Sequence, residues 1–321
     1  MVNLLGVNLA GISLKTPVIA ASGTFGFGRE FADLVPLEEL GAVCVKGLSL
    51  RPWEGNRGQR VTQTPSGVLN AIGLENPGCD YFLEHILPQL HTYKVPVIAN
   101  IYGHSVQEYG DVARALDVDG ICAVEINISC PNVKQGGLAF GTDPEMISEV
   151  VRAVKKNTHK PVITKLSPNV TDIVCLAQAA ENAGSDVLSL INTLLGMKID
   201  VRTHKPVLGN IVGGLSGPAV RPVAVRMVYE VAQHVAVPII GMGGITCAAD
   251  ALEFMMAGAC AVAVGTANLY QPDTVHTLTQ DLQTYCEENH LSNLQDIVGL
   301  ALPQGKKSRM YSQHKEQNHE R

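Results

Sequence analysis

The sequence predicts an α/β protein, a (β/α)8 TIM barrel with long insertions at the C-terminal face of the barrel. Eight short β-rich segments recur along the chain, helical segments separate them, and the series occupies roughly 250 residues, as in such barrels. The segments are nearly continuous apolar runs, as expected for strands that are buried on both faces. They are Val18–Ser22, Val43–Gly47, Val97–Ile101, Val124–Ser129, Val162–Ser167, Val187–Asn192, Ile239–Gly244 and Ala261–Thr266.

A doubly wound open sheet is the alternative fold for this alternation of strands and helices. That fold usually carries a Gly-rich fingerprint directly after its first strand. Here the first strand continues into "ASGTFGFG", which does not space its glycines as the fingerprint requires. The closed barrel is therefore favoured.

The helical segments carry recognisable start signals. The segment "DPEMISEVVRAVKKNT" begins with Asp143, Pro144 and Glu145. A capping acid, a proline in the first turn and an early carboxylate are typical of a helix N-terminus. We therefore expect a helix to begin at this point.

Two connections are longer than a plain barrel needs, from Leu48 to about Pro77 and from Thr193 to about Pro218. Long excursions of this kind are often functional. We expect residues 1–305 to form one barrel domain. The polar tail, residues 306–321, is expected to be disordered or a surface helix.

The composition excludes several classes of protein. The chain has 321 residues, 46% hydrophobic and 17% charged, with a net charge of −6, which argues against a nucleic-acid partner. Its eight cysteines form no C-x-x-C pair, so neither a metal site nor an iron–sulfur cluster is expected in this chain. The N-terminus lacks a signal-peptide pattern and no apolar run could cross a bilayer, so we expect a cytoplasmic protein without membrane contact.

Almost every predicted strand ends in a polar side chain or a glycine. Active sites of TIM barrels lie at these C-terminal ends, so this clustering predicts a functional site. The residues at the ends are Ser22, Lys46, Asn100, Asn127 with the nearby Cys130, Lys165, Asn192, Gly243, Gly244, Gly265 and Thr266.

The last two strands and two lysines predict an anionic ligand. Glycines and a hydroxyl after strands 7 and 8 are typical of a phosphate site, although tight packing of helix on strand is the alternative reading. Lys46 and Lys165 follow apolar residues, where an ammonium is costly unless it is paired. Each could snorkel or join a buried ion pair. A shared flavin would explain both, since a lysine near the N1/O2 edge tunes the electronics of the ring.

Four asparagines and one cysteine suggest the substrate chemistry. Asn70, Asn127, Asn132 and Asn192 could read a ring rich in N–H and C=O groups, such as a pyrimidine, although a loop asparagine is often only a turn former. Cys130, in "SCP" at a strand exit, could act as a base if its surroundings favour the thiolate. No histidine is near it in sequence, so a protease-like pair is disfavoured.

These motifs resemble the class 1 dihydroorotate dehydrogenases, and specifically the class 1B catalytic subunit. The resemblance covers roughly residues 2–305. It is carried by "ASGTFG", "LNAIGLENPG", "IANI", "EINISCPNVKQGGLAFG", "TKLSPNV", "INT", "GGLSGPA", "GMGGI" and "VGTA". The segments "NVKQGGLAFGTDP" and "INTLLGMKIDVRTHKPVLGNIVGGLSGPAV" look like class 1B.

The resemblance implies FMN across the barrel mouth and oxidation of (S)-dihydroorotate to orotate in de novo pyrimidine (UMP) biosynthesis. Cys130 would take the C5 proton, the C6 hydride would pass to FMN N5, and Lys46 would lie between flavin and substrate as a second catalytic residue. The substrate-binding residues would be Lys46, Asn70, Ala71, Ile72, Gly73, Leu74, Asn127, Asn132, Asn192 and Thr193. The FMN-binding residues would be Ser22, Gly23, Lys46, Gly47, Asn100, Asn127, Lys165, Ile191, Gly217, Gly243, Gly244, Gly265 and Thr266.

The resemblance also implies a partner. Class 1B enzymes pass electrons to NAD+ through a separate subunit with FAD and a 2Fe–2S cluster, in a heterotetramer built on a homodimer. Class 2 enzymes have serine in place of Cys130 and an N-terminal membrane helix, so quinone is not the expected acceptor. A class 1A-like fumarate-dependent enzyme and a dihydropyrimidine dehydrogenase-like FMN barrel are the alternatives, with a phosphosugar isomerase or a non-catalytic phosphate-binding barrel further away.

Overall fold

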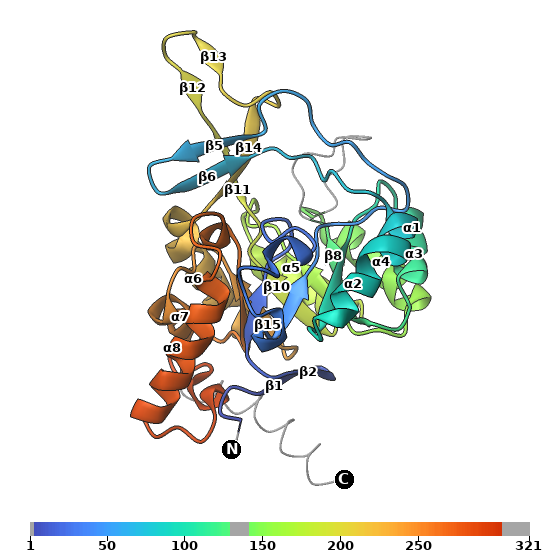
Figure 1. The fold of residues 1–321 in the computed structure, drawn as a ribbon. Helices are drawn as coiled ribbons and strands as arrows, with labels where there is room; N and C mark the ends of the chain where they lie inside the picture. Colours follow the sequence, from blue (N-terminus) through green and yellow to red (C-terminus); the bar gives the residue numbers. More distant parts are fainter. Residues whose placement is uncertain (1–2, 129–140, 304–321) are drawn as a thin grey trace.

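A closed barrel of eight parallel strands forms the centre of the molecule (Figure 1). The computed structural model describes residues 3–128 and 141–303. The barrel strands follow one another round the barrel in chain order, and the last pairs with the first. They are β3 (Val18–Ala20), β4 (Ala42–Cys44), β7 (Val97–Ile101), β8 (Ile121–Asn127), β9 (Val162–Lys165), β10 (Val187–Leu190), β15 (Ile239–Met242) and β16 (Ala261–Val264). The predicted (β/α)8 barrel is confirmed.

Each predicted apolar run overlaps one barrel strand, but β4 and β8 begin before their runs, and most runs extend past the C-terminal end of the strand. The run Val43–Gly47, for example, contributes only Val43 and Cys44 to β4, which begins one residue earlier at Ala42. Lys46 donates its backbone N–H to Gly26 rather than to a neighbouring strand. Lys46 and the other residues that follow the strands therefore lie beyond the ladder at the mouth of the barrel, whereas Asn100, Asn127 and Lys165 are still strand residues.

Helices surround the barrel and bury its outer face. Val124 and Ile126 of β8 belong to the same apolar core as Val150 and Val154 of a surrounding helix. The helices are α1 (Cys79–Tyr81), α2 (Leu87–Thr92), α3 (Val106–Ala115), α4 (Pro144–Asn157), α5 (Ile173–Asn182), α6 (Arg221–Ala232), α7 (Ala248–Met256) and α8 (Thr274–Glu288). Short helical turns are η1 (Arg29–Phe31), η2 (Leu37–Glu39), η3 (Phe82–Ile86), η4 (Pro218–Val220), η5 (Thr266–Leu269) and η6 (Leu294–Ile297). The predicted start of α4 is confirmed, because the Asp143 side chain accepts from the Glu145 N–H.

The two long connections pair with each other to form a second sheet. The first contains β5 (Val61–Thr64) and β6 (Gly67–Asn70), and the second contains β11 (Leu194–Met197) and β14 (Val212–Ser216). The strand order is β11-β14-β6-β5, and Gly214 pairs with Asn70. Figure 1 shows this sheet over one end of the barrel, with the hairpin of β12 (Ile199–Asp200) and β13 (Lys205–Pro206) projecting beyond it. Residues 306–321, the predicted tail, lie outside the described residues.

An N-terminal hairpin, which the sequence reading did not predict, closes the other end of the barrel. Strands β1 (Val7–Leu9) and β2 (Ile12–Leu14) are antiparallel, and each alternates buried and exposed residues. Leu9 and Ile12 belong to the same apolar cluster as the inward-facing Ile19 and Ile98. The hairpin therefore completes the interior of the barrel at its N-terminal end.

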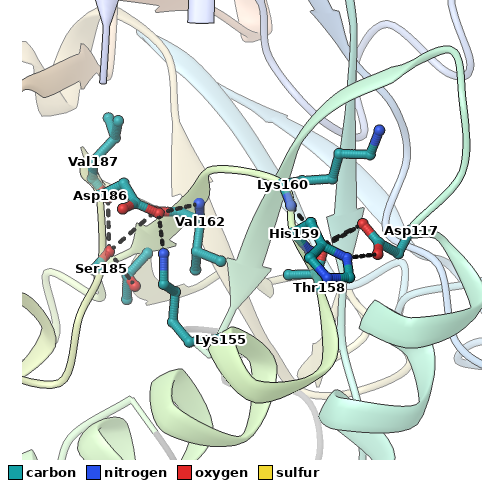
Figure 2. Close-up of polar contacts among 10 residues, drawn as sticks. Asp117, Lys155, Thr158, His159, Lys160, Val162, Ser185, Asp186 and Val187 are labelled. Carbon is teal, nitrogen blue, oxygen red and sulfur yellow. Dashed lines mark hydrogen bonds and ion pairs between the residues drawn. The ribbon is translucent and has the colours of Figure 1, made fainter. Parts of the chain in front are cut away.

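Polar contacts also tie the strand beginnings together at this end (Figure 2). The Asp186 carboxylate, just before β10, accepts from Lys155 Nζ and from the backbone N–H of Val162, both at 2.7 Å. Asp117, at the end of α3, pairs with His159 at 2.7 Å in the same way. These contacts join helix ends to β9 and β10, so they stabilise the face opposite the mouth.

We expect Leu9→Ala to lower the free energy of unfolding by about 2 to 5 kcal/mol, because it opens a cavity beneath the barrel. Leu9 is fully buried in the hairpin. Ser13→Ala on the exposed side of the same hairpin is the control and should stay within about 0.5 kcal/mol of the parent. The measurement is urea denaturation followed by circular dichroism. Equal midpoints for the two variants would show that the hairpin does not contribute to the core.

Candidate active site

A pocket of about 370 Å³ lies at the mouth of the barrel, beneath the second sheet. The strand exits form its floor, and Val68 and Asn70 of β6 with Leu215 and Ser216 of β14 contribute from the sheet. The pocket brings together nearly all of the predicted site residues that the structure describes. They are Ser22, Gly23, Lys46, Gly47, Asn70, Ile72, Gly73, Leu74, Asn100, Asn127, Lys165, Ile191, Asn192, Thr193, Gly217, Gly243, Gly244, Gly265 and Thr266.

Three of the predicted site residues are not among the described residues that line the pocket. Ala71 does not line the pocket: its backbone N–H donates to Arg60 O at 2.7 Å, and its carbonyl accepts from Asn56 at 3.0 Å. The side chain of Ala71 is buried in a small apolar cluster under the sheet. Ala71 therefore supports the neighbouring loop from behind. Cys130 and Asn132 lie outside the described residues.

The glycines after β15 allow the backbone to approach closely. Gly243 and Gly244 have φ values of 130° and 78°, which disfavour any other residue. A Cβ on Gly244 would lie 2.7 Å from Gly217 O, and one on Gly243 would lie 2.9 Å from Ala224 Cβ. Tight packing, which the sequence analysis gave as the alternative to a phosphate site, is therefore part of the role of Gly243 and Gly244. The same glycines also line the pocket beside Thr266, whose hydroxyl donates to Ser216 Oγ at 2.8 Å.

The two predicted lysines enter the pocket in different electrostatic settings. Lys165 is buried, and its ammonium donates to Ser22 Oγ at 3.3 Å and lies 3.8 Å from the Glu125 carboxylate. Lys46 is partly exposed and lies 4.0 Å from Glu75, which also pairs with Arg60 at 2.7 Å. Lys165 is thus both a member of a buried ion pair and a pocket residue.

Glu125 is a site residue that the sequence reading missed. It is only 3% exposed, and it lies inside the barrel below the pocket. Its Oε1 accepts from Asn100 Nδ2 at 2.6 Å and its Oε2 from Ser189 Oγ at 2.8 Å. The sequence did contain a signal for Glu125, because it is an acidic residue inside an apolar strand. It stands two positions before Asn127, which places both side chains on the same face of β8.

The Cys44 thiol completes this buried group. Its Sγ donates to Glu125 Oε1 at 3.3 Å. Burial, with the nearby Glu125 carboxylate second, raises the pKa of Cys44 well above its usual value. The thiol therefore stays protonated and acts as a donor, which distinguishes it from a reactive cysteine.

Asn76 is a second missed residue, and it holds the loop that follows β6. Its side-chain amide donates to Leu74 O at 2.9 Å and to Tyr102 Oη at 3.0 Å. Its oxygen accepts from the backbone N–H of Ser49 and of Gly78. Leu74 has φ of 61°, an uncommon conformation for a residue other than glycine. Asn76 therefore fixes the backbone of residues 72–74, which face the pocket.

Two buried polar atoms in the pocket wall have no hydrogen-bond partner among the residues that the structure describes, Thr24 Oγ1 and Asn100 Oδ1. An unpaired buried polar group is costly, so these atoms are suited to a ligand with complementary groups. Together with two lysines and the glycines at the strand exits, they describe a site for an anionic ligand that carries hydrogen-bonding groups. In the described parts of the chain, no cluster of histidine, cysteine and acidic residues could hold a metal ion, and no helix is long and apolar enough to span a bilayer.

Comparison with known proteins identifies the family of this chain. The family model described as dihydroorotate dehydrogenase matches residues 4–285. A protein of Geotalea uraniireducens (strain Rf4), named dihydroorotate dehydrogenase B (NAD(+)), catalytic subunit, is 55% identical over 299 residues, 93% of this chain and 98% of that protein. A protein of Desulforudis audaxviator (strain MP104C) with the same name is 56% identical over 296 residues, 92% of this chain and 96% of that protein. The chain therefore belongs to the dihydroorotate dehydrogenase family.

Proposed function

We propose that this protein oxidises (S)-dihydroorotate to orotate in de novo pyrimidine (UMP) biosynthesis. The observation that carries the proposal is that strand exits and insertion loops, far apart in sequence, converge on one pocket. That pocket combines amide side chains, two lysines and a glycine-lined end, as a flavin and a cyclic ureide require. The names of the close relatives support the same reaction.

The described residues fit FMN. Backbone around Gly243, Gly244, Gly265 and Thr266 would hold the phosphate, since exposed N–H groups and the absence of side chains suit an anion. Lys165 and Asn100 would contact the ring, and Ser22, Gly23, Gly47, Asn127, Ile191 and Gly217 would line its length. The orphaned Asn100 and Thr24 oxygens would accept from ring or ribityl donors. When bound, FMN supplies the acceptor for the hydride that leaves C6 of the substrate.

The substrate would lie between the flavin site and the second sheet. Asn192 Nδ2 donates to Asn127 Oδ1 at 3.3 Å, so these two amides form one wall. Asn70 comes from β6 on the opposite side, and Thr193 lies beside Asn192. Lys46 and the backbone of residues 72–74 would hold the carboxylate, with Asn132 as a further contact. Contacts from several elements would hold the substrate in the orientation that reacts, which favours the reaction.

Cys130 would take the proton from C5. It follows β8, the strand that carries Asn127 into the pocket, at a distance of three residues along the chain. A thiol has a reference pKa of about 8.5, near enough to neutrality to act as a general base when positive charge favours the thiolate. The proton leaves to the Cys130 sulfur while Asn127 and Asn192 keep the ring in place.

We further propose that the electrons leave through a second subunit. The relatives are named as a catalytic subunit linked to NAD+. The chain shows no dinucleotide fingerprint after its first strand, and its pocket is roofed by a sheet. An iron–sulfur flavoprotein carrying FAD and a 2Fe–2S cluster would therefore accept the electrons and reduce NAD+. A homodimer of this chain would form the core of the heterotetramer, in the cytoplasm.

The purified chain should be yellow, with the absorbance spectrum of a bound flavin. Under anaerobic conditions dihydroorotate should bleach that flavin. Dihydrouracil, which lacks the carboxylate, should bleach it at least tenfold more slowly, because the loss of the carboxylate contacts should cost at least about 1.4 kcal/mol, which corresponds to a factor of ten. Stopped-flow absorbance measures both rates. A colourless protein that binds no added FMN would refute the proposed function, and faster bleaching by dihydrouracil would indicate a dihydropyrimidine dehydrogenase-like enzyme.

Cys130→Ser should keep its flavin and lose about 10²- to 10⁴-fold in the rate of flavin reduction near neutral pH, since a hydroxyl is a poorer general base. The rate of the variant should rise as the pH is raised. Cys175→Ser, on the exposed face of α5, is the matched control and should reduce flavin at the parental rate. If the two serine variants react equally fast, Cys130 is not the base.

The isolated chain should reduce its flavin with dihydroorotate but transfer electrons to NAD+ very slowly. Hydride transfer to nicotinamide requires the nicotinamide to stack on the flavin, and the chain shows no dinucleotide fingerprint after its first strand to bind it. Addition of the iron–sulfur flavoprotein should restore NAD+ reduction, measured as NADH absorbance. The isolated chain with fumarate serves as a parallel assay. Equal NAD+ rates with and without the flavoprotein would contradict the proposed partner, and rapid turnover with fumarate would indicate a class 1A-like enzyme.

A further inference from the structure

A buried polar group lies inside the barrel directly below the pocket. Its members come from five neighbouring strands, β4, β7, β8, β9 and β10, and surround one carboxylate. We call it the Glu125 cluster; its members are Cys44, Asn100, Glu125, Lys165 and Ser189. Each of these residues is at most 5% exposed. Asn100 and Lys165 also line the pocket, whereas Glu125 does not, so the cluster connects the barrel interior to the ligand site.

The carboxylate of Glu125 is supported on every side. Asn100, Ser189 and Cys44 each direct a donor at it, and the Lys165 ammonium lies 3.8 Å away. A buried carboxylate without such partners would be strongly unfavourable. The arrangement therefore keeps a negative charge inside the barrel, with a positive charge above it that also faces the pocket.

Glu125 determines how the Asn100 amide is turned. An ionised carboxylate only accepts, so the group 2.6 Å from it must be the NH₂ of Asn100. The amide oxygen must then point the other way, and Asn100 Oδ1 has no partner among the described residues. A Cβ on Gly47 would lie 2.8 Å from this oxygen, so glycine there leaves it open. Asn100 is thus presented to the pocket as an acceptor.

Glu125 also restrains Lys165. The ammonium lies between the carboxylate and Ser22 Oγ, at 3.8 and 3.3 Å. Both Lys165 and Ser22 line the pocket. If the negative charge of Glu125 were removed, the Lys165 ammonium would lose its counter-ion but would still line the pocket.

We propose that Glu125 is a positioning residue for the flavin: it holds Asn100 as an acceptor, holds Lys165 as a donor, and partly offsets the lysine charge that the flavin experiences. This inference rests on the proposed function, since it assumes that FMN occupies the pocket. Glu125 acts through these two side chains and does not touch the ligand itself.

The test is Glu125→Gln, which keeps the size of the side chain and removes its charge. Without the negative charge, the more electron-rich reduced flavin is favoured, so the midpoint potential of bound FMN should become more positive. We expect the ratio of affinities for reduced and oxidised FMN to rise about tenfold, which equals about 30 mV for a two-electron couple. The potential is measured by anaerobic reduction against a reference dye.

Asp186→Asn is the matched control, because Asp186 also pairs with a lysine (Figure 2) but lies just before β10, at the opposite end of the strands from the mouth. It should lower thermal stability and leave the potential unchanged. An unchanged or more negative potential in Glu125→Gln, with stability lowered as in Asp186→Asn, would show that Glu125 is only structural and would overturn the inference.

Ser189→Ala provides a second test that keeps the charge, in case Glu125→Gln does not fold. It removes only the hydrogen bond to Oε2, so the potential should stay near the parental value while the affinity for oxidised FMN falls several-fold as Glu125 becomes less fixed. Titration of apoprotein with FMN measures this affinity, and a parental value would contradict the inference. If the parent itself binds no FMN, the proposed function fails instead, so the two failures are distinguishable.

Discussion

Closure of the parallel barrel is the constraint on which the rest of the structure depends. Val264 of the last barrel strand pairs with Ala20 of the first, so each of the eight barrel strands has a neighbour on both sides and all eight point the same way. Every strand therefore ends at the same rim. Residues as far apart in sequence as Ser22 and Thr266 become neighbours around one pocket for this reason alone.

The two ends of the barrel serve different purposes. The N-terminal end is covered by the apolar β1–β2 hairpin and tied by the Asp186 and Asp117 contacts, which satisfy backbone groups at the starts of strands. The mouth instead holds backbone in uncommon conformations, at Leu74 and at the glycines after β15. It also leaves polar atoms of Thr24 and Asn100 unpaired among the described residues. Packing stabilises one end, and the other end keeps unsatisfied groups for binding.

The interior of the barrel is apolar near its N-terminal end and polar near the pocket. Ile19, Ile98 and Ile163 fill the lower part, whereas the Glu125 cluster occupies the part below the pocket. A charged layer at this depth is tolerated because each carboxylate oxygen has a donor and the ammonium is close. The cluster presents Lys165 and Asn100 to the pocket in defined orientations.

Much of the fold and of the site could be read from local sequence. Continuous apolar runs identified all eight barrel strands, the Asp143 cap identified the start of α4, and the polar residues and glycines at the strand exits identified the floor of the pocket. These features depend on residues that are neighbours in sequence, and on the rule that the C-terminal ends of parallel barrel strands lie at one rim. The pairing of β6 with β14, the place of the β1–β2 hairpin and the partners of Glu125 were not predicted. Only the tertiary structure decided them, because each depends on contacts between segments far apart in the chain, whose pairing carries no local pattern.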